Sequence, residues 1–392
     1  MNHSAFARRF LLPLVPLYQM GLALRDLSLL APARRLRYPV VSIGNLSTGG
    51  AGKTPLTIAL AWALERHGIR VDILSRGYGR EGDLPTRVEE EGSAAEYGDE
   101  PLLMAREAEV PVYVAPQRYD AGLLAEAKDA ADAQAAARAL LEEQPPVAAG
   151  AANWDQAVEP GSAMVLVKPE LEVGPFPAES SADPDSPGEP ELPLPRLVHL
   201  LDDGFQHRQL ARDVDILLLN SHDWQDWLLP AGNLREPLEA ARRASVIAIP
   251  ANEPELEVAL HFWGWTGPIW LLHRIMEVPK VSGPVAAFCG IARPEQFFEG
   301  LESAGMEIAA RFAFPDHFTY TRPALDELLA NAQAAGAHSL ITTEKDLVRL
   351  GKMTALFPKS MPLATARLRI KIENQAEAIN WLIKQLAPRP ES

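Results

Sequence analysis

"YPVVSIGNLSTGGAGKTPLTIALAWALERHG", residues 38–68, decides the fold class of this chain. Its apolar start predicts a buried strand over residues 38–45, and its end predicts a helix over residues 54–68. A glycine-rich turn joins the two, so backbone N–H groups and the start of the helix can surround a phosphate. The alternative, a glycine-rich turn without a ligand, fits less well with "GKT" placed at the strand-to-helix junction.

The turn departs from the usual phosphate-loop pattern at one position. G-x-x-x-x-G-K-[ST] begins with glycine, whereas this chain has Ser47 there. Lys53 is expected to reach the β- and γ-phosphates of a nucleotide, and the Thr54 hydroxyl is expected to bind Mg²⁺. The residues predicted to contact the nucleotide in this turn are Ser47, Thr48, Gly49, Gly50, Ala51, Gly52, Lys53 and Thr54.

Further apolar runs alternate with helical patterns along the chain. Additional strands are predicted over residues 69–77, 110–116, 196–203, 213–220 and 244–250. A second set of strands is predicted over residues 268–275, 284–291, 306–314, 338–346 and 364–372, with helices at about 293–304, 322–335 and 374–387. Strands that alternate with helices pair in parallel. The predicted fold is α/β: a P-loop NTPase-like, doubly wound, mostly parallel sheet with a second, smaller α/β domain.

Composition divides the chain into three expected parts. These are an N-terminal apolar and basic helix over residues 1–36, a P-loop domain over 37–265 and a smaller C-terminal α/β domain over 266–392. Within the P-loop domain, residues 145–195 hold eleven prolines, nine acidic residues and one lysine. Such a composition is typical of an insertion without a packed core, and it predicts no chemistry there.

The N-terminal apolar run, "FLLPLVPLYQMGLAL" at residues 10–24, has three interpretations. Fifteen residues with two prolines are too few for a spanning helix, which needs roughly 20 apolar residues. A helix lying in a membrane interface, a helix docked on the domain and a signal peptide remain. Six arginines against one acidic residue in residues 1–38 favour the membrane-associating helix, because arginines attract anionic headgroups.

Charge and cysteine content exclude several classes of protein. The formal net charge of −15 argues against general nucleic-acid binding, which needs a basic surface. Cys289 is the single cysteine, which rules out a disulfide framework and a cysteine-based zinc site. A single cysteine also fits a reducing compartment.

Acidic residues follow one of the predicted strands directly. "LVHLLDDGFQH" runs from apolar residues into Asp202 and Asp203. A P-loop site needs a carboxylate at the end of a neighbouring strand to hold its metal, and either aspartate can do so. The alternative is an acidic turn of no chemical importance; the P-loop in the same chain favours the metal site.

Other polar residues lie in predicted loops. Asp99 precedes a helix in "EYGDEPLLMA", where an ordinary N-cap is the plain alternative. Arg118 follows a strand in "APQRYDAG", and "LLPAGNLREPL" carries Arg235 and Glu236. His317 follows a strand in "FPDHFTYT", and an isolated histidine is more often structural. Together these residues offer arginines for phosphate charge and an Asp/His set for proton transfer.

At this point the set of motifs resembles a known family. "GNLSTGGAGKTP", "SRGYGR", "GDEPLLMA", "PQRYDAG", "LDDGFQHRQL", "LPAGNLREP", "FCGIARPEQFF", "FPDHFTYT" and "TTEKD" occur in the order found in the tetraacyldisaccharide 4′-kinase family. The resemblance runs from the N-terminal apolar helix to about residue 350. That family carries Ser or Thr where Ser47 stands. Two departures remain: the long insertion at 145–195, and "AGNLREP" where "AGPLREP" is more common.

The resemblance implies a function and roles for these residues. It implies an ATP-dependent kinase that phosphorylates the 4′-hydroxyl of a tetraacyldisaccharide 1-phosphate, giving lipid IV-A in lipid A biosynthesis. Asp99 would take the proton from the hydroxyl, with His317 orienting it and Lys53 as a third catalytic residue. The residues implied to contact ATP or phosphates beyond the P-loop are Arg118, Gln206, His207 and Arg235, and those implied for Mg²⁺ are Thr54, Asp202, Asp203 and Glu236.

The resemblance also implies where the enzyme works. An acylated glucosamine disaccharide 1-phosphate stays in a membrane, so the enzyme is expected to be peripheral on the cytoplasmic face of the bacterial inner membrane, where ATP is available. Two alternatives remain open at this point. One is a P-loop ATPase or GTPase that switches conformation, and the other is a soluble small-molecule kinase or ATP-dependent ligase with a merely docked N-terminal helix.

Overall fold

A computed structural model describes residues 8–28, 32–50, 52–142 and 194–386. Ala51 and almost all of the predicted insertion at 145–195 lie outside the described residues. The chain forms two units: Met1–Asp129 with Pro193–Ser392 is one, and Ala130–Leu192 is the other. All of the strands and all of the predicted site residues belong to the first unit.

One sheet of twelve strands runs through the first unit, in the order β10-β9-β11-β12-β8-β7-β6-β1-β5-β2-β4-β3. The strands are β1 (Val40–Asn45), β2 (Arg70–Ser75), β3 (Thr86–Arg87), β4 (Val112–Val114), β5 (Leu197–Asp202), β6 (Val214–Leu218), β7 (Val246–Pro250), β8 (Ile269–Glu277), β9 (Val285–Cys289), β10 (Ile308–Ala313), β11 (Ser339–Thr343) and β12 (Leu363–Ile372). A strand forms within every predicted strand range, although β11 ends before the end predicted for it. The sequence analysis missed β3, whose two residues are too few to show a pattern.

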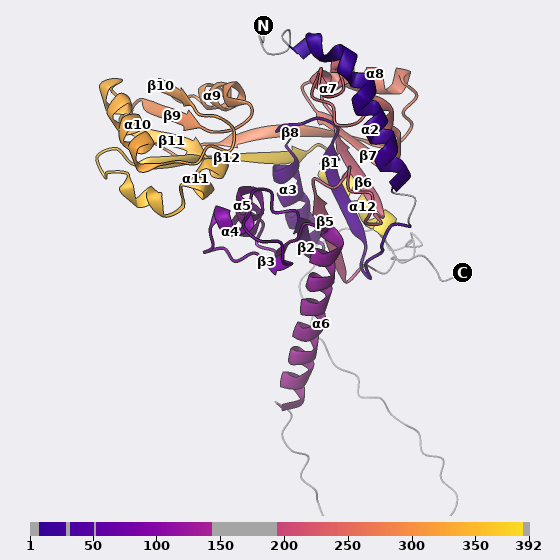
Figure 1. The fold of residues 1–392 in the computed structure, drawn as a ribbon. Helices are drawn as coiled ribbons and strands as arrows, with labels where there is room; N and C mark the ends of the chain where they lie inside the picture. The colour runs from indigo at the N-terminus through magenta and orange to yellow at the C-terminus, as the bar shows by residue number, and fades with distance from the viewer. Residues whose placement is uncertain (1–7, 29–31, 51, 143–193, 387–392) are drawn as a thin grey trace, which may run out of the picture. The chain divides into compact units, whose positions relative to one another are not determined.

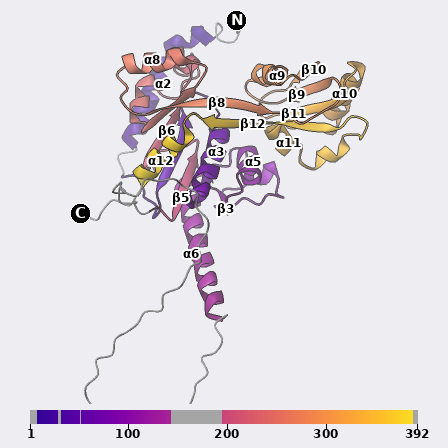
Figure 2. The same cartoon turned by 180° about the vertical axis from the view of Figure 1, so that it is seen from behind.

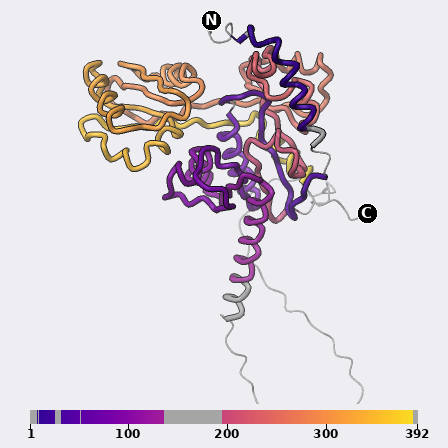
Figure 3. Tube along the Cα trace, in the orientation of Figure 1, coloured from indigo at the N-terminus to yellow at the C-terminus, as the bar shows by residue number. Residues whose placement is uncertain are grey.

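Most neighbouring strands are parallel, as expected for a doubly wound fold. The exceptions are β3 against β4, and β12 against β8. Both ribbon views show the long strands β8 and β12 running from β9–β11 toward β7 and β6, and the tube in Figure 3 traces the same two segments (Figure 1, Figure 2). Since β8 begins at Ile269, one sheet continues past the expected boundary at 265, and the division there stays a prediction.

Helices cover the sheet on both faces. The helices are η1 (Arg9–Leu14), α2 (Val15–Ser28), α3 (Lys53–Arg66), α4 (Ala94–Tyr97), α5 (Asp99–Ala108), α6 (Arg118–Glu142), α7 (Ser221–Gln225), η2 (Leu238–Arg243), α8 (Pro254–Phe262), α9 (Pro294–Ser303), α10 (Arg322–Ala334), α11 (Glu344–Leu350), η3 (Gly351–Leu356) and α12 (Gln375–Leu386). Apolar side chains of α3, α5 and α12 form one buried cluster with β1, β2 and β5. Helices α8 and η2 pack on the other face of β6 and β7.

Helix α11 corrects the sequence analysis. Residues 338–346 were expected to be a strand, but β11 ends at Thr343 and α11 starts at Glu344. The Thr343 hydroxyl accepts a hydrogen bond from the backbone N–H of Asp346 at 3.1 Å, which caps the helix. The motif "TTEKD" is therefore a strand-to-helix junction, and its charged residues lie at a helix start beside the carboxyl end of the strand.

Candidate active site

The glycine-rich turn has the backbone that a phosphate loop requires. Gly49 and Gly52 adopt φ angles of 105° and 92°, which side-chain-bearing residues rarely take. Ser47, the departure from the usual pattern, is buried and accepts a hydrogen bond from Asn45 Nδ2 at 3.1 Å. The Thr48 N–H donates to the carbonyl of Asn233 at 2.8 Å. The loop "AGNLREP" is thus bonded to the start of the glycine-rich turn. Helix α3 begins directly after the turn.

Two cationic side chains near the turn, Lys53 and Arg235, contact oxygen atoms of the protein itself. Lys53 Nζ donates to Asn45 Oδ1 at 2.9 Å and lies 3.4 Å from Asp203 Oδ1. Arg235 donates to both oxygens of Asp203, at 2.9 and 3.0 Å, and to Asn45 Oδ1 at 2.6 Å. Burial raises the pKa of Asp203, but Lys53 and Arg235 outweigh it and hold that pKa below its usual range. Asn45 Oδ1 accepts hydrogen bonds from both Lys53 and Arg235. The sequence analysis did not include Asn45 in the site.

Asp202 differs from its neighbour Asp203. It ends β5, beside Ile43 of β1, and is buried. Its Oδ2 accepts a weak hydrogen bond from Ser75 at 3.4 Å, while Oδ1 has no hydrogen-bond partner among the described residues. Burial, with the charges of Glu100 and Asp203, raises the pKa of Asp202 to about 7. Among the described residues Asp202 therefore forms no ion pair, and the charges of Lys53 and Lys345 only partly offset the rise of its pKa.

Arg118, Gln206 and His207 form a polar group near the two aspartates. Arg118 is the first residue of α6 and is buried, and its pKa is lowered by burial while the charge of Asp203 acts against that. Burial, followed by the charge of Arg118, lowers the pKa of His207 to about 4, so its ring is neutral at pH 7. Arg118 Nε, Gln206 Oε1 and His207 Nε2 have no hydrogen-bond partner among the described residues.

Asp99 and His317 meet although 218 residues separate them. His317 Nδ1 lies 3.0 Å from Asp99 Oδ2. Asp99 is the first residue of α5, and Gly98 before it has φ 90°. His317 has φ 57°, an uncommon conformation for a residue with a side chain. The hydrogen bond with Asp99 raises the pKa of His317. Asp99 is not the N-cap that the plain alternative expected: Gly98 holds that position without a side-chain cap, and Asp99 Oδ1 accepts only the neighbouring Glu100 N–H at 3.0 Å among the described residues.

Helix α11 brings two cations that the sequence analysis did not include in the site. Arg349 donates to Asp99 Oδ2 through Nε at 2.8 Å and through Nη2 at 2.6 Å. Lys345 Nζ is paired with Glu100. The motif "TTEKD" contained Lys345, but its contact with the "GDEP" motif depends on a sheet order that sequence patterns do not give.

The four residues implied for Mg²⁺ are not all brought together. Glu236 is buried, and its two oxygens pair with Arg25 at 3.0 Å and with Arg243. Thr54 is buried in the first turn of α3. Within residues 8–28, 32–50, 52–142 and 194–386, no cluster of three or more His, Cys, Asp or Glu side chains is arranged to hold a metal ion. The role of Glu236 as a metal ligand stays a prediction. In this structure both of its carboxylate oxygens are paired with arginines.

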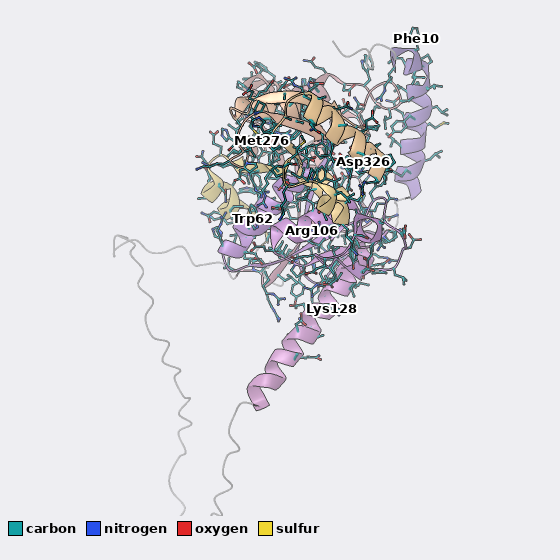
Figure 4. The ribbon with its side chains drawn as sticks, turned by 90° about the vertical axis from the view of Figure 1, so that its left-hand side faces the viewer. Phe10, Trp62, Arg106, Lys128, Met276 and Asp326 are labelled. Atoms are coloured by element: carbon teal, nitrogen blue, oxygen red, sulfur yellow. The ribbon has the colours of Figure 1, made fainter. Side chains whose placement is uncertain are left out.

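The N-terminal helix is bonded to the loop that carries Arg235. Tyr18 donates its hydroxyl to the carbonyl of Arg235 at 3.0 Å, and Arg25 pairs with Glu236. Other side chains of η1 and α2 face away: Phe10 is 86% exposed, and Leu17 is 61% exposed. Figure 4 labels Phe10 at the start of this helix. Among the residues that the structure describes, no helix is both long enough and apolar enough to span a bilayer.

Comparisons with known proteins agree on one family. Residues 7–387 match the family described as tetraacyldisaccharide-1-P 4′-kinase. A tetraacyldisaccharide 4′-kinase of Koribacter versatilis is 35% identical over 391 residues, covering 96% of this chain and 99% of the relative. One of Anaeromyxobacter dehalogenans is 35% identical over 355 residues, covering 84% and 76%. The crystal structure of LpxK from Aquifex aeolicus in complex with ATP is similar with a TM-score of 0.64 and 29% identity, covering 97% of this chain and 99% of that one.

Proposed function

This chain belongs to the tetraacyldisaccharide-1-P 4′-kinase family, and on that premise we propose that it phosphorylates the 4′-hydroxyl of a tetraacyldisaccharide 1-phosphate with ATP. The product is lipid IV-A, an intermediate of lipid A biosynthesis. The observation that best supports the proposal is the Asp99–His317 contact at 3.0 Å, because a carboxylate bonded to a histidine suits the role of general base for a hydroxyl. A switch ATPase that attacks with water, or a kinase for another small molecule, does not account for the family match.

The reaction forms a bond between the 4′-oxygen and the γ-phosphorus. The bond between that phosphorus and the β,γ-bridging oxygen breaks, and ADP leaves with its electron pair. Asp99 takes the hydroxyl proton, and His317 orients the Asp99 carboxylate. Such a reaction asks a protein chiefly for positioning and for stabilisation of charge on the transferred group. Lys53, Arg118 and Arg235 offer positive charge for that task.

Phosphates of ATP are proposed to lie along Ser47–Thr54, where the backbone of Gly49 and Gly52 permits close approach. Lys53 then exchanges its contact with Asn45 for phosphate oxygens, since a phosphate is a stronger partner for an ammonium than an amide is. Arg118, whose Nε has no hydrogen-bond partner among the described residues, is proposed to bind a phosphate of ATP or the 1-phosphate of the lipid. Gln206 and His207 offer further unpaired polar atoms beside it.

The residues present fit a magnesium ion. Asp202 has a buried oxygen without a hydrogen-bond partner among the described residues, and its pKa is raised to about 7. A divalent cation would bring the positive charge that favours its ionised form. Asp202 and Thr54 would hold Mg²⁺, with Asp203 able to join once phosphates attract Lys53 and Arg235 away from it. When bound, Mg²⁺ neutralises charge on the phosphates.

A membrane surface is the proposed location of the enzyme. The exposed apolar side chains of η1 and α2, together with nearby arginines, suit the interface of an anionic membrane. The same helix is bonded to Arg235 and Glu236, so an enzyme bound through it has the active-site loop beside the lipid surface. We propose that it acts as a peripheral protein on the cytoplasmic face of the inner membrane, without nucleic-acid partners.

Direct assay of the reaction tests the proposed function. Purified full-length protein is mixed with Mg-ATP and a tetraacyldisaccharide 1-phosphate in detergent, and the lipid is examined by mass spectrometry. We expect the lipid to gain one phosphate while ADP forms in equal amount. If ATP binds but the lipid is unchanged, the assignment as a lipid kinase is wrong.

The proposed location is tested separately. Full-length protein and a variant lacking residues 1–30 are compared for sedimentation with vesicles containing anionic lipid, and for activity on lipid dispersed in detergent. We expect only the full-length protein to sediment. Equal sedimentation of the two forms contradicts the membrane role of the N-terminal helix without affecting the proposed reaction.

A further inference from the structure

Asp99 is held by an arginine on one oxygen only. Oδ2 accepts from His317 Nδ1 at 3.0 Å and from Arg349 at 2.8 and 2.6 Å. Oδ1 accepts only the backbone N–H of Glu100, at 3.0 Å, among the contacts of the described residues. Three donors therefore fill the bonding capacity of Oδ2, whereas Oδ1 keeps a free lone pair.

Arg349 is itself fixed by buried groups on the far side of its guanidinium. Its side chain is 6% exposed, and Nη1 donates to Asp346 Oδ1 at 3.2 Å and to the Gly290 carbonyl. Asp346 is fully buried and accepts from the Gly290 N–H and the Tyr320 hydroxyl, both at 3.0 Å. A planar guanidinium bound on two sides has one orientation available, so it sets the position of the carboxylate that it contacts.

We propose that Arg349 is a positioning residue of the phosphoryl transfer: it grips Oδ2 of Asp99 and so presents Oδ1 to the acceptor hydroxyl. The proposal rests on the proposed function, since it assigns a role within that reaction. It extends the site to helix α11, which supplies Arg349 from one turn beyond Lys345.

The electrostatics agree with this geometry. Burial raises the pKa of Asp99, but the hydrogen bond from His317 and the charge of Arg349 outweigh it and hold the pKa well below its usual range. Asp99 is thus a weak base that is ionised throughout the neutral pH range. A weak base is sufficient here, because the attacking oxygen gains little charge in a loose phosphoryl-transfer transition state. Its position then matters more than its basicity.

The competing explanation is that the Arg349–Asp99 contact only stabilises the packing of α5 against α11. The chain offers a matched control for this explanation. Arg369 donates to Glu107 of α5 at 2.8 Å and to Glu344 of α11 at 2.9 Å. It connects the same two helices as Arg349 does, but within the part of the chain that the structure describes it makes no hydrogen bond or ion pair with Asp99. Its removal loosens the pair of helices without altering the proposed base.

The experiment compares wild type, Arg349→Gln, Arg349→Lys and Arg369→Met in the full-length protein. For each, kcat and KM are measured from pH 5 to 9 with Mg-ATP and the tetraacyldisaccharide 1-phosphate, and ATP affinity is measured separately. The groups facing Asp99 that can affect the profile are His317, Arg349, Lys345 and Glu100, with Asp316 and Asp346 acting through the first two.

We expect Arg349→Gln to lower kcat about 100-fold with little change in ATP affinity, since a small displacement of a catalytic group costs about that much. Because the contact with His317 remains, Asp99 is expected to stay ionised from pH 5 to 9 in this variant too, so the loss of kcat should be the same across that range. Arg349→Lys should recover part of the lost kcat, because an ammonium can keep one contact. Arg369→Met should lower the melting temperature and leave kcat unchanged.

A kcat of Arg349→Gln equal to that of wild type overturns the proposal, as does an equal loss of kcat in Arg369→Met. If Arg349→Gln does not fold, Arg349→Lys decides, and a kcat equal to that of wild type at unchanged ATP affinity counts against positioning by the fork. A wild-type protein that forms no phosphorylated lipid instead refutes the proposed function, which separates the two failures.

Discussion

Asp203 and Asp99 have a similar electrostatic setting but different origins. Each carboxylate accepts two hydrogen bonds from an arginine: Arg235 for Asp203 at 2.9 and 3.0 Å, and Arg349 for Asp99 at 2.6 and 2.8 Å. In both, burial raises the pKa and the cations more than reverse that. However, Arg235 is 32 residues from Asp203, whereas Arg349 is 250 residues from Asp99.

The difference shows two ways of building a charged site. The Asp203 side is made at the carboxyl ends of neighbouring parallel strands, where ligands commonly bind in such sheets. The Asp99 side needs β12 and β8 to bring α11 against α5. We expect damage to the first side to weaken nucleotide binding, and damage to the second side to affect mainly the chemical step.

The largest effect is expected from Asp99→Ala. Loss of the base should lower kcat about 1000-fold, within the range typical of a general base, while ATP binding changes little. Steady-state kinetics and equilibrium ATP binding check this. The control is Asp326→Ala, which removes an exposed carboxylate that pairs with Arg322 at 2.9 Å and should behave as wild type. Lost ATP affinity with an unaltered chemical step in Asp99→Ala would contradict the role as base.

Lys53→Ala should damage both binding and turnover. The ammonium is proposed to contact phosphates in the ground state and in the transition state, so kcat/KM for ATP should fall about 100-fold or more. ATP titration with single-turnover kinetics separates the two terms. Lys359→Ala, at an exposed position, is the matched control. If Lys53→Ala binds ATP as well as wild type does, the phosphate contact is wrong.

Asn45→Ala should have a moderate effect on the nucleotide side. Asn45 Oδ1 accepts from both Lys53 and Arg235, so its loss leaves these cations free to settle on Asp203. We expect kcat/KM for ATP to fall about tenfold, equivalent to roughly 1.4 kcal/mol, with no change in the pH profile. A fall in kcat as large as the fall in kcat/KM would mean that Asn45 also affects the chemical step, so that the two sides are not separable as proposed.

The smallest effect is expected from His317→Gln on stability. The folded-state pKa of His317 is raised by its hydrogen bond with Asp99. The stability that this contact contributes is therefore fully present below the unfolded pKa of about 6.5, and is lost as pH rises through the folded pKa. The melting temperature of the variant should lie roughly 1–2 °C below wild type at pH 6, with the gap closing toward pH 9. A gap that widens with pH contradicts this assignment.

The amino-acid sequence by itself determined the α/β fold, the expected strands and the phosphate loop, because each depends on residues close together in the chain. The pattern of Gly52, Lys53 and Thr54 after an apolar strand predicts a turn whose backbone the structure confirms. The motif "LLDD" likewise places Asp202 at the end of β5, beside β1. The order of nine motifs was also sufficient for the family, which the comparisons confirm.

Only the tertiary structure decided what each charge contacts. Nothing near Arg349 in the sequence points to Asp99, and Glu236 reads as a candidate metal ligand until Arg25 and Arg243 are seen on its two oxygens. The start of α11 was hidden because "TTEKD" follows an apolar strand without a glycine or proline between them. Local sequence patterns determine where the backbone turns, since helix, strand and turn preferences depend on residues close together in the chain. The partners of a buried charge depend on sheet order, which brings together segments that lie hundreds of residues apart.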